Sequence, residues 1–371
     1  MNIICEKESL LKILSIAVNA INERSNVESL KCFKIEAKGK QLVITTNNLE
    51  TNIICKLLAT ITQEGVVLVH AKTLLNIISK LPSGDVSMYL SENQTLLIQC
   101  GNSTFNIYTM KEEEFPQDMT IEESIEIKID PLVFKDIIRR VSFSASEEEE
   151  KLILNGVLIE QNKENNELIF VAADGYRLAK DKIEISAEKT QNTIIPIKTI
   201  KEIISIIGTY SINNFSLHIS VNKIKFICDD IQIYSRVITG KFPDYKMLIP
   251  QEHNLEVIMD RKDFLEACDR MNIIAQKNSY MVKIEILGQL LIISSVTPDF
   301  GDGSEKISAK IKGDESVQVV FNVKLMIEAL KNIESKEIVL YIINDEKPIC
   351  MKEINNQNYI YIMMPIKVKR D

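Results

Sequence analysis

The sequence contains no tryptophan, only nine prolines and only three histidines among its 371 residues. Disordered chains are rich in proline and poor in apolar residues, so few prolines and a hydrophobic share of 45% predict a folded globular protein. The histidines, His70, His218 and His253, are far apart and have no metal-ligand spacing. We therefore expect no metal site built on histidine.

Paired cysteines and long apolar runs are also missing. The seven cysteines occur singly, without a CxxC pair, which predicts reduced thiols of a cytosolic protein. No apolar run reaches the roughly 18 residues that span a bilayer, and the N-terminus lacks the basic and apolar regions of a signal peptide. We therefore expect a cytoplasmic protein that does not bind a membrane.

Motifs for catalysis are absent as well. The sequence has no Walker motif, GxGxxG, GxSxG or HExxH. Asp299-Phe300-Gly301 matches the metal-binding triplet of kinases, but no glycine-rich phosphate loop or catalytic loop accompanies it, so a turn is expected. These observations predict a protein that is not an enzyme and needs no cofactor.

What the chain does contain is a threefold repeat. A strand-like Ile-Glu pair recurs with Glu36, Glu160 and Glu285, at offsets of 124 and 125 residues. An amphipathic helical segment begins in each third with a lysine at the same spacing of 126: Lys72, Lys198 and Lys324. Each copy is long enough to bury its own core, so the repeat predicts three domains, 1–122, 123–249 and 250–371.

Each copy alternates short strands with two helical segments. The apolar spacing predicts helices at 8–24, 72–80, 131–145, 196–208, 261–277 and 322–333. Asp130 and Asp260 are good helix N-caps, Glu6 is a weaker one, and Gly208 is expected to end its helix in a left-handed conformation. The other segments alternate apolar and polar residues, so we predict an α+β protein with two helices packed on antiparallel sheet in each copy.

Charge is distributed unevenly over these segments. The net charge is −8, yet the six predicted helices carry 15 Lys and Arg against 8 Asp and Glu, so the rest of the chain holds −15. Solvated helix faces often carry basic residues, and this interpretation stays open. The alternative is that the helices share one surface that faces a polyanion.

Two further segments have distinctive composition. The stretch 172–179 (AADGYRLA) places a turn and an arginine between apolar residues, and 359–368 (YIYIMMPIKV) ends in methionines and a proline. Both are compatible with plain strands. Soft methionine side chains beside a proline would also suit a groove that accepts several peptides, with Arg177 fixing their orientation.

These segments resemble the DNA polymerase III beta subunit family, the bacterial sliding clamps. The similarity rests on 154–158 (LNGVL), 171–179 (VAADGYRLA), 240–245 (GKFPDY) and Met364-Pro365, and it extends over the whole chain. It implies a DNA clamp fold in which a head-to-tail homodimer of six domains forms a ring around duplex DNA. It also implies that the ring tethers the DNA polymerase III alpha subunit, the clamp loader and other clamp-binding-motif proteins.

The resemblance assigns a partner-peptide cleft and a dimer contact. The cleft comprises Leu154, Ala173, Gly175, Tyr176, Arg177, Leu178, Pro243, Met247, Leu248, Ile362, Met363, Met364, Pro365, Ile366, Lys367 and Val368. The dimer contact comprises Phe105, Ile107, Ile273 and Ile274. Met247 stands where the family often has arginine, Ala173 where it has threonine, and Thr73 and Thr104 where basic residues are usual.

Contacts with DNA are expected from eight basic residues. Arg24 and Lys72 match positions that contact DNA in the family, and the others are expected from the positive charge of the helices: Lys80, Arg139, Arg140, Lys198, Lys201 and Lys324. The loop 147–150 consists of four glutamates, so it is expected not to touch phosphate. Two alternatives remain: a protein-binding scaffold that does not encircle DNA, and an enzyme with an unrecognised site.

Overall fold

The structure is a computed structural model that describes residues 1–110, 115–121, 123–148, 150–185, 189–313 and 316–367. Its contacts divide the chain into two units. The first holds Met1–Phe134 and Lys201–Val237, and the second holds Lys135–Ile200 and Ile238–Asp371. Over the described ranges, no helix has both the length and the apolar character needed to cross a membrane.

The predicted threefold repeat is confirmed by the order of elements. The first copy comprises β1 (Asn2–Glu6), α1 (Lys7–Ala17), β2 (Cys32–Lys38), β3 (Gln41–Asn47), β4 (Thr51–Leu58), β5 (Thr60–Gln63), β6 (Gly65–His70), α2 (Ala71–Lys80), β7 (Asp85–Leu90), β8 (Thr95–Cys100) and β9 (Ser103–Tyr108). The second comprises β10 (Ile125–Lys128), α3 (Pro131–Ser142), β11 (Gly156–Asn162), β12 (Glu167–Ala173), β13 (Arg177–Glu184), β14 (Gln191–Pro196), α4 (Ile197–Thr209), β15 (Phe215–Ile219), β16 (Lys223–Cys228) and β17 (Ile231–Arg236). The third comprises β18 (Leu255–Asp260), α5 (Arg261–Ala275), β19 (Met281–Leu287), β20 (Leu290–Thr297), β21 (Gly301–Ile307), β22 (Ala309–Lys312), β23 (Val317–Asn322), α6 (Val323–Lys331), β24 (Glu337–Ile342), β25 (Ile349–Glu353) and β26 (Asn356–Met363). All strand pairs within the sheets are antiparallel, so the α+β prediction is confirmed.

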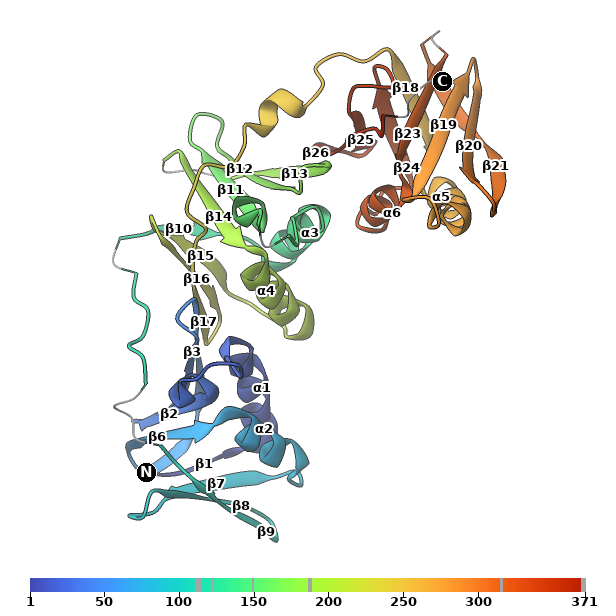
Figure 1. Cartoon of the computed structure of the whole chain (residues 1–371). Helices are drawn as coiled ribbons and strands as arrows, with labels where there is room; N and C mark the ends of the chain where they lie inside the picture. Colours follow the sequence, from blue (N-terminus) through green and yellow to red (C-terminus); the bar gives the residue numbers. More distant parts are fainter. Residues whose placement is uncertain (111–114, 122, 149, 186–188, 314–315, 368–371) are drawn as a thin grey trace. The chain divides into compact units, whose positions relative to one another are not determined.

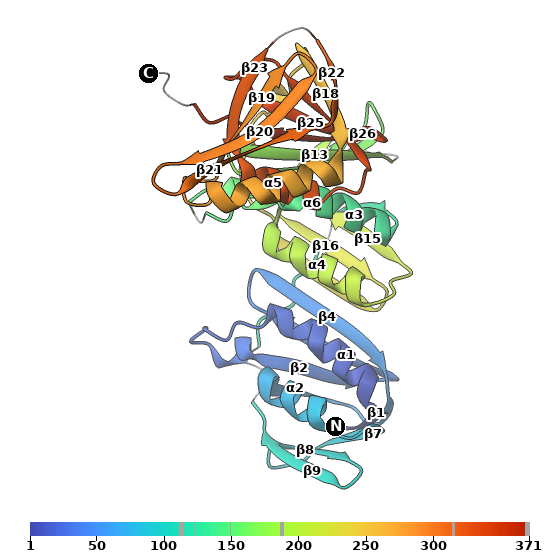
Figure 2. The ribbon, with the colours of Figure 1, turned by 90° about the vertical axis from the view of Figure 1, so that its right-hand side faces the viewer.

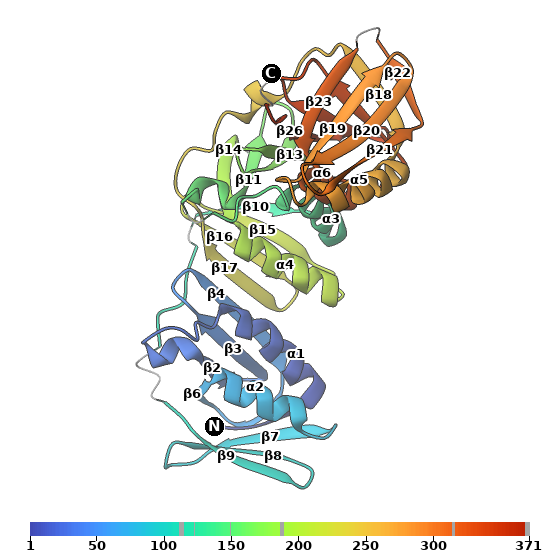
Figure 3. The same cartoon turned by 45° about the vertical axis from the view of Figure 1, so that its right-hand side comes forward.

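The first unit contains two sheets. One has five strands in the order β5-β1-β7-β8-β9, and the other has eight in the order β10-β15-β16-β17-β4-β3-β2-β6. The helices α1 and α2 lie side by side in this unit and contact β3, β4 and β6 (Figure 3). The core is formed by fully buried side chains such as Leu10, Leu14 and Phe33.

The second unit repeats the plan with a sheet of nine strands, β14-β11-β12-β13-β26-β25-β24-β18-β22, and one of four, β21-β20-β19-β23. The helices α5 and α6 lie side by side in it (Figure 2). Strand β13 meets β26 in the nine-stranded sheet (Figure 1), which brings the middle of the sequence against its end.

The long sheets arise because consecutive copies join edge to edge. Strand β4 of the first copy pairs with β17 of the second, and β13 of the second pairs with β26 of the third. Within the described ranges, the equivalent edges β9 and β21 have a neighbour on one side only, β8 and β20 respectively. These two strands therefore leave a row of backbone N–H and C=O groups unpaired.

Several predicted helix ends are wrong. The helix predicted at 131–145 ends at Ser142. The first helix was predicted to reach residue 24, but α1 ends at Ala17, and a single 3-10 turn follows it at Val18–Ala20. The Thr46 hydroxyl donates to the Ala17 carbonyl at 2.7 Å, and Arg24 lies in a turn beyond the helix. Gly208 does not end its helix, because α4 continues to Thr209 and the next amide still bonds four residues back, Tyr210 N–H to the Ile206 carbonyl.

The predicted caps at Asp130 and Asp260 are confirmed. The Asp130 carboxylate accepts backbone bonds from Leu132 and Val133 at 2.8 and 3.1 Å. Asp260 accepts from Lys262 and Asp263 at the same two distances. Glu6 makes no such bond to α1, as expected of a weak cap. Asp299 and Phe300 form the turn that was expected between β20 and β21.

All seven cysteines are free and buried. Burial raises the pKa of the thiols of Cys5, Cys55 and Cys228 to about 12. Thiolate is the reactive form, so these side chains are inert in the folded protein.

The Asp260→Ala substitution should lower the free energy of unfolding by about 1 kcal/mol, because two amides at the start of α5 lose their acceptor. Hydrogen exchange of the Lys262 and Asp263 amides should accelerate. The Asp260→Asn variant keeps an oxygen acceptor and should stay near the parent. Equal effects of Ala and Asn would show that the cap bonds contribute nothing.

Candidate partner-binding site

The site begins with a tight turn between β12 and β13. Asp174 holds it, since one carboxylate oxygen accepts from the backbone N–H groups of Tyr176 and Arg177 at 2.8 and 3.0 Å. Gly175 has φ +97°, a conformation that other residues adopt only with strain. The turn leaves the Tyr176 ring 61% exposed at its tip.

The C-terminal segment lies beside this turn. Strand β26 pairs with β13 so that Ile362 is opposite Leu178 and Met363 opposite Arg177. Past the end of the strand, the Met364 N–H donates to the Tyr176 carbonyl at 2.9 Å. The segments 171–179 and 359–368, which the sequence separates by about half the chain, are therefore hydrogen-bonded neighbours.

Apolar side chains from both segments and from the 238–249 linker form one hydrophobic cluster. Leu178, Ala173 and Ile362 are buried in it, together with Phe242 and Tyr245 of the linker. Leu154 packs against it from a single 3-10 turn, Leu152–Leu154. The structure thus brings together side chains from every stretch of the predicted cleft.

Four large apolar side chains of the predicted cleft remain exposed around this cluster. They are Tyr176, Met247, Leu248 and Met364, exposed by 61%, 83%, 48% and 42%. We name these four, with the cluster beneath them, the partner surface. Its exposed part is apolar and includes two methionines, whose flexible side chains can adapt to different ligands.

A buried carboxylate anchors the linker that carries Met247 and Leu248. Glu160 of β11 is 6% exposed and accepts from the Tyr245 hydroxyl at 3.1 Å and from the Lys246 ammonium at 2.7 Å. Burial and the nearby Glu160 charge raise the pKa of the Tyr245 hydroxyl. These bonds hold the 3-10 helix η5 (Tyr245–Leu248) against β11 and so present Met247 and Leu248 outward.

The Arg177 side chain faces inward, although the sequence predicted that it orients a peptide. Its guanidinium bonds to the Asp174 carboxylate, the Glu328 carboxylate and the Phe143 carbonyl at 3.0, 2.5 and 2.7 Å. The side chain is 9% exposed, and the guanidinium lies over the Phe143 ring. Arg177 therefore supports the turn from behind.

Other predicted cleft residues differ in how they are placed. Met363 is fully buried, because side chains alternate along β26 and its neighbour Ile362 takes the face of the hydrophobic cluster. Pro243 is exposed in the linker, Pro365 and Ile366 are half-buried in the tail, and Lys367 is exposed. Val368 and, in the acidic loop, Glu149 lie outside the described residues.

Sequence reasoning missed several contributors. Ile153, Ile249 and Tyr341 pack against the cluster. Lys151 lies with its ammonium 5.2 Å from the centre of the Tyr176 ring and donates to the Asp174 carbonyl at 3.1 Å. Ile153 and Lys151 directly precede the Leu154 motif, so proximity in sequence was an available signal; Tyr341 offered none.

The repeat gives each copy an equivalent chain crossing, and the first and third copies have a hollow beside it. After its last strand, the chain crosses back and donates one backbone bond to the strand before the second helix: Met110 to Leu68, Ile238 to Ile194, and Ile366 to Val320, at 2.9, 2.9 and 2.7 Å. The residue paired with that acceptor on the neighbouring strand differs between copies: Lys34, Leu158 and Lys283. Only the middle copy has an apolar residue there, and Leu158 belongs to the cluster under the partner surface.

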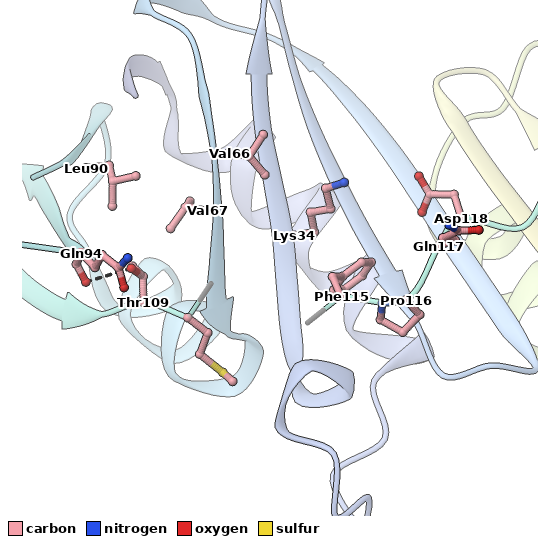
Figure 4. Close-up of a pocket in the computed structure, with 11 residues that line it drawn as sticks. Lys34, Val66, Val67, Leu90, Gln94, Thr109, Phe115, Pro116, Gln117 and Asp118 are labelled. Carbon is pink, nitrogen blue, oxygen red and sulfur yellow. Dashed lines mark hydrogen bonds between the residues drawn. The ribbon is translucent and has the colours of Figure 1, made fainter. Parts of the chain in front are cut away.

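The hollow of the first copy is a cavity of about 640 Å³ between strands β2 and β6 and the segment 115–118. Figure 4 shows Lys34 beside Phe115 on one wall and Leu90, Gln94 and Thr109 on the other. The hollow of the third copy, about 510 Å³, is lined by Lys283, Val320 and the tail residue Ile366. Because a lysine lines each of them, both hollows are less suited to an apolar peptide than the corresponding position in the middle copy, where Leu158 stands.

The basic residues predicted to contact DNA fall into two groups. Six are exposed: Arg24, Lys72, Lys80, Lys198, Lys201 and Lys324. Of these six, Lys72 pairs with Glu23 at 3.3 Å. The remaining two are held in shorter ion pairs, Arg139 with Glu334 at 2.8 Å and Arg140 with the buried Asp181 at 2.6 Å. Much of the charge of Arg139 and Arg140 is therefore neutralised within the protein.

The residues predicted at the dimer contact lie on or beside the two open sheet edges. Phe105 and Ile107 are on β9, and Phe105 is 40% exposed. Ile273 and Ile274 are in the last turn of α5, which packs against β21. Ile273 is 60% exposed, an unusual amount for an isoleucine.

Replacing Tyr245 by phenylalanine should lower the free energy of unfolding by about 1–2 kcal/mol, because a buried carboxylate oxygen loses its donor. Urea denaturation measures this. The Tyr176→Phe variant removes a hydroxyl from a ring that is 61% exposed and should change little. If both variants are equally stable, the Glu160 bond does not anchor the linker.

Comparison with known proteins gives one answer over the whole chain. Models of the N-terminal, central and C-terminal domains of the DNA polymerase III beta subunit match residues 1–122, 128–244 and 246–367. The "Beta sliding clamp" proteins of Rickettsia bellii and Bacillus subtilis are 29% and 28% identical to it, over 99% of this chain and 100% of theirs. The solved DNA polymerase III beta subunit of Thermotoga maritima superposes with a TM-score of 0.92 at 27% identity, covering 99% of this chain and 100% of that one. The DNA polymerase sliding clamp of Bacillus subtilis gives 0.94 at 26%, with both chains fully covered. The chain belongs to the DNA polymerase III beta subunit family.

Proposed function

We propose that this protein is the processivity clamp of a replicative DNA polymerase and has no catalytic activity. Two chains, each with domains 1–122, 123–249 and 250–371, join head to tail into a ring of six domains around duplex DNA in the cytoplasm. The ring tethers the DNA polymerase III alpha subunit and other clamp-binding-motif proteins through the partner surface, and a clamp loader places it on DNA.

The observation that carries this proposal is the pair of open edges. Each junction inside the chain joins the last strand of one copy to the fourth strand of the preceding copy, β17 to β4 and β26 to β13. Among the described residues, β9 of the first copy has no fourth strand beside it, and β21 of the third copy has no last strand beside it. A second chain supplies both missing neighbours, and a contact between unlike surfaces can close on itself.

The internal junctions also predict the register of the joint between subunits. Ile233 is opposite Ile53 in one junction, and Tyr361 is opposite Ala179 in the other. On the last strands, Phe105, Ile233 and Tyr361 are equivalent, because they pair with the equivalent residues Ile98, Phe226 and Met351. On the fourth strands, Ile53, Ala179 and Gly303 are equivalent, because they pair with Thr46, Ala172 and Ser295. Phe105 should therefore lie opposite Gly303 of the partner subunit.

The absence of a side chain at Gly303 suits this register. A Cβ there would point at α5, 3.6 Å from the Met271 sulfur and 3.9 Å from Ile274. The space over Gly303 can receive the ring of Phe105 from the other subunit, which then covers Met271 and Ile274. Aromatic residues opposite glycine in neighbouring strands stabilise sheets in this way.

An engineered disulfide tests the register. The outward-facing neighbours in this alignment are Asn106 and Asp302, so a chain with Asn106→Cys and Asp302→Cys should oxidise to a covalent dimer, seen on non-reducing gels. The control pair, Thr104→Cys with Asp302→Cys, is two residues out of register and should crosslink poorly. Native thiols do not interfere, because all seven are buried. A parent that is monomeric at micromolar concentration by light scattering would contradict the ring.

The charge distribution supports the contact with DNA. The helices α1–α6 carry 14 Lys and Arg against 7 Asp and Glu, so they hold +7 while the rest of the chain holds −15. Diffuse phosphate contacts of this kind are independent of sequence and allow sliding, while a closed ring prevents dissociation.

Clamps loaded on nicked circular DNA should stay bound, whereas clamps loaded on linear DNA of equal length should dissociate. Gel filtration of the two complexes measures this difference. On linear duplex, Lys72→Ala and Lys198→Ala should each reduce the slope of log K against log salt by about 0.9. The Lys128→Ala variant removes an exposed charge from strand β10, not from a helix, and should bind like the parent. Equal retention on linear and circular DNA would exclude topological binding.

A further inference from the structure

The support of the Tyr176 turn extends to a helix that is not part of the partner surface. Glu328 is in α6, one turn after Lys324 and one turn before Lys331, and its side chain is 36% exposed. Its carboxylate bonds to Arg177 at 2.5 Å across 151 positions of sequence. Nothing in the sequence linked these two residues.

We propose that Glu328 is a positioning residue for the partner surface, acting through Arg177 on the turn that carries Tyr176. The inference rests on the proposed function, since it requires that partner peptides bind beside this turn. Glu328 is not one of the residues of the partner surface and acts on it through its bond to Arg177. In this way Glu328 fixes the position of the turn that carries Tyr176.

The chain of contacts is continuous. Asp174 uses one carboxylate oxygen for the turn amides and the other for the Arg177 guanidinium at 3.0 Å. The turn in turn holds the tail, because the Tyr176 carbonyl accepts from the Met364 N–H at 2.9 Å. A shift of Arg177 therefore moves both Tyr176 and Met364, two of the four exposed side chains of the partner surface.

The bond to Glu328 determines the position of the Arg177 side chain. The guanidinium is largely buried, and its three nitrogens are directed to acceptors on three different segments: the turn, α6 and Phe143, the residue that follows α3. Without the Glu328 charge, Asp174 is the one carboxylate still bound to this guanidinium among the described contacts. The balance of forces on Arg177 then favours movement toward solvent and toward Asp174, which loosens the turn.

A second contact supports a role for α6 in this region. The Tyr361 hydroxyl of β26 donates to the Leu325 carbonyl of α6 at 3.0 Å, and the Tyr361 ring packs against Phe143 at 5.9 Å. The guanidinium of Arg177 lies over the same Phe143 ring. Helix α6 thus meets both strands that build the partner surface, β13 through Arg177 and β26 through Tyr361.

The test measures the Kd of a fluorescein-labelled peptide carrying the clamp-binding motif of the DNA polymerase III alpha subunit. The Glu328→Gln variant, nearly isosteric, should weaken binding about 3- to 10-fold through loss of a charge-assisted bond, with the dimer intact. The matched control is Glu334→Gln: Glu334 pairs with Arg139 at 2.8 Å and is 77% exposed, so peptide affinity should not change.

A double-mutant cycle separates positioning from general stability. Arg177→Lys keeps the charge but loses the fork, so it should weaken the peptide by itself, and adding Glu328→Gln should then cost little more. Parental affinity in Glu328→Gln, equal losses in Glu328→Gln and Glu334→Gln, or independent losses in the cycle would each overturn the inference alone. A parent chain that does not bind the peptide overturns the proposed function and the inference together.

Discussion

The architecture depends on one interaction, the antiparallel pairing of a last strand with a fourth strand. Used twice within the chain, at β4 with β17 and at β13 with β26, it fuses small sheets into sheets of eight and nine strands. Edge strands are usually a liability, because exposed backbone groups recruit other chains. Here the same chemistry joins one copy to the next, and β9 and β21 present edges of the same two kinds.

The partner surface is built on top of this pairing and is held by buried charge. The strands β13 and β26 bring the turn and the tail together, but backbone bonds alone do not fix where their side chains stand. Two anchors do that: Glu160, which binds Tyr245 and Lys246, and Arg177, which binds Asp174 and Glu328. Each places a polar network behind an apolar surface, so that the exposed part stays apolar while the support is rigid.

Much of this could be predicted from the sequence. The triplication, the fold class, the caps at Asp130 and Asp260 and the turn at Asp299 depend on local patterns, and the structure confirms them. The end of α1 was missed because it depends on Thr46, a residue of another element. The inward direction of Arg177 could not be predicted either, because its partner Glu328 is 151 positions away and its choice between solvent and protein is set by packing. Long-range polar partners of this kind leave no periodic signal in a sequence.

The burial of all seven thiols makes the protein suitable for site-specific labelling. Because native cysteines are shielded and, at Cys5, Cys55 and Cys228, protonated up to a pKa of about 12, a maleimide dye would react with a single introduced surface cysteine on an otherwise silent background. No native residue would need to be removed first. Energy transfer between donor and acceptor fluorophores on separately labelled chains could then measure the exchange of chains in real time, with the native core residues unchanged.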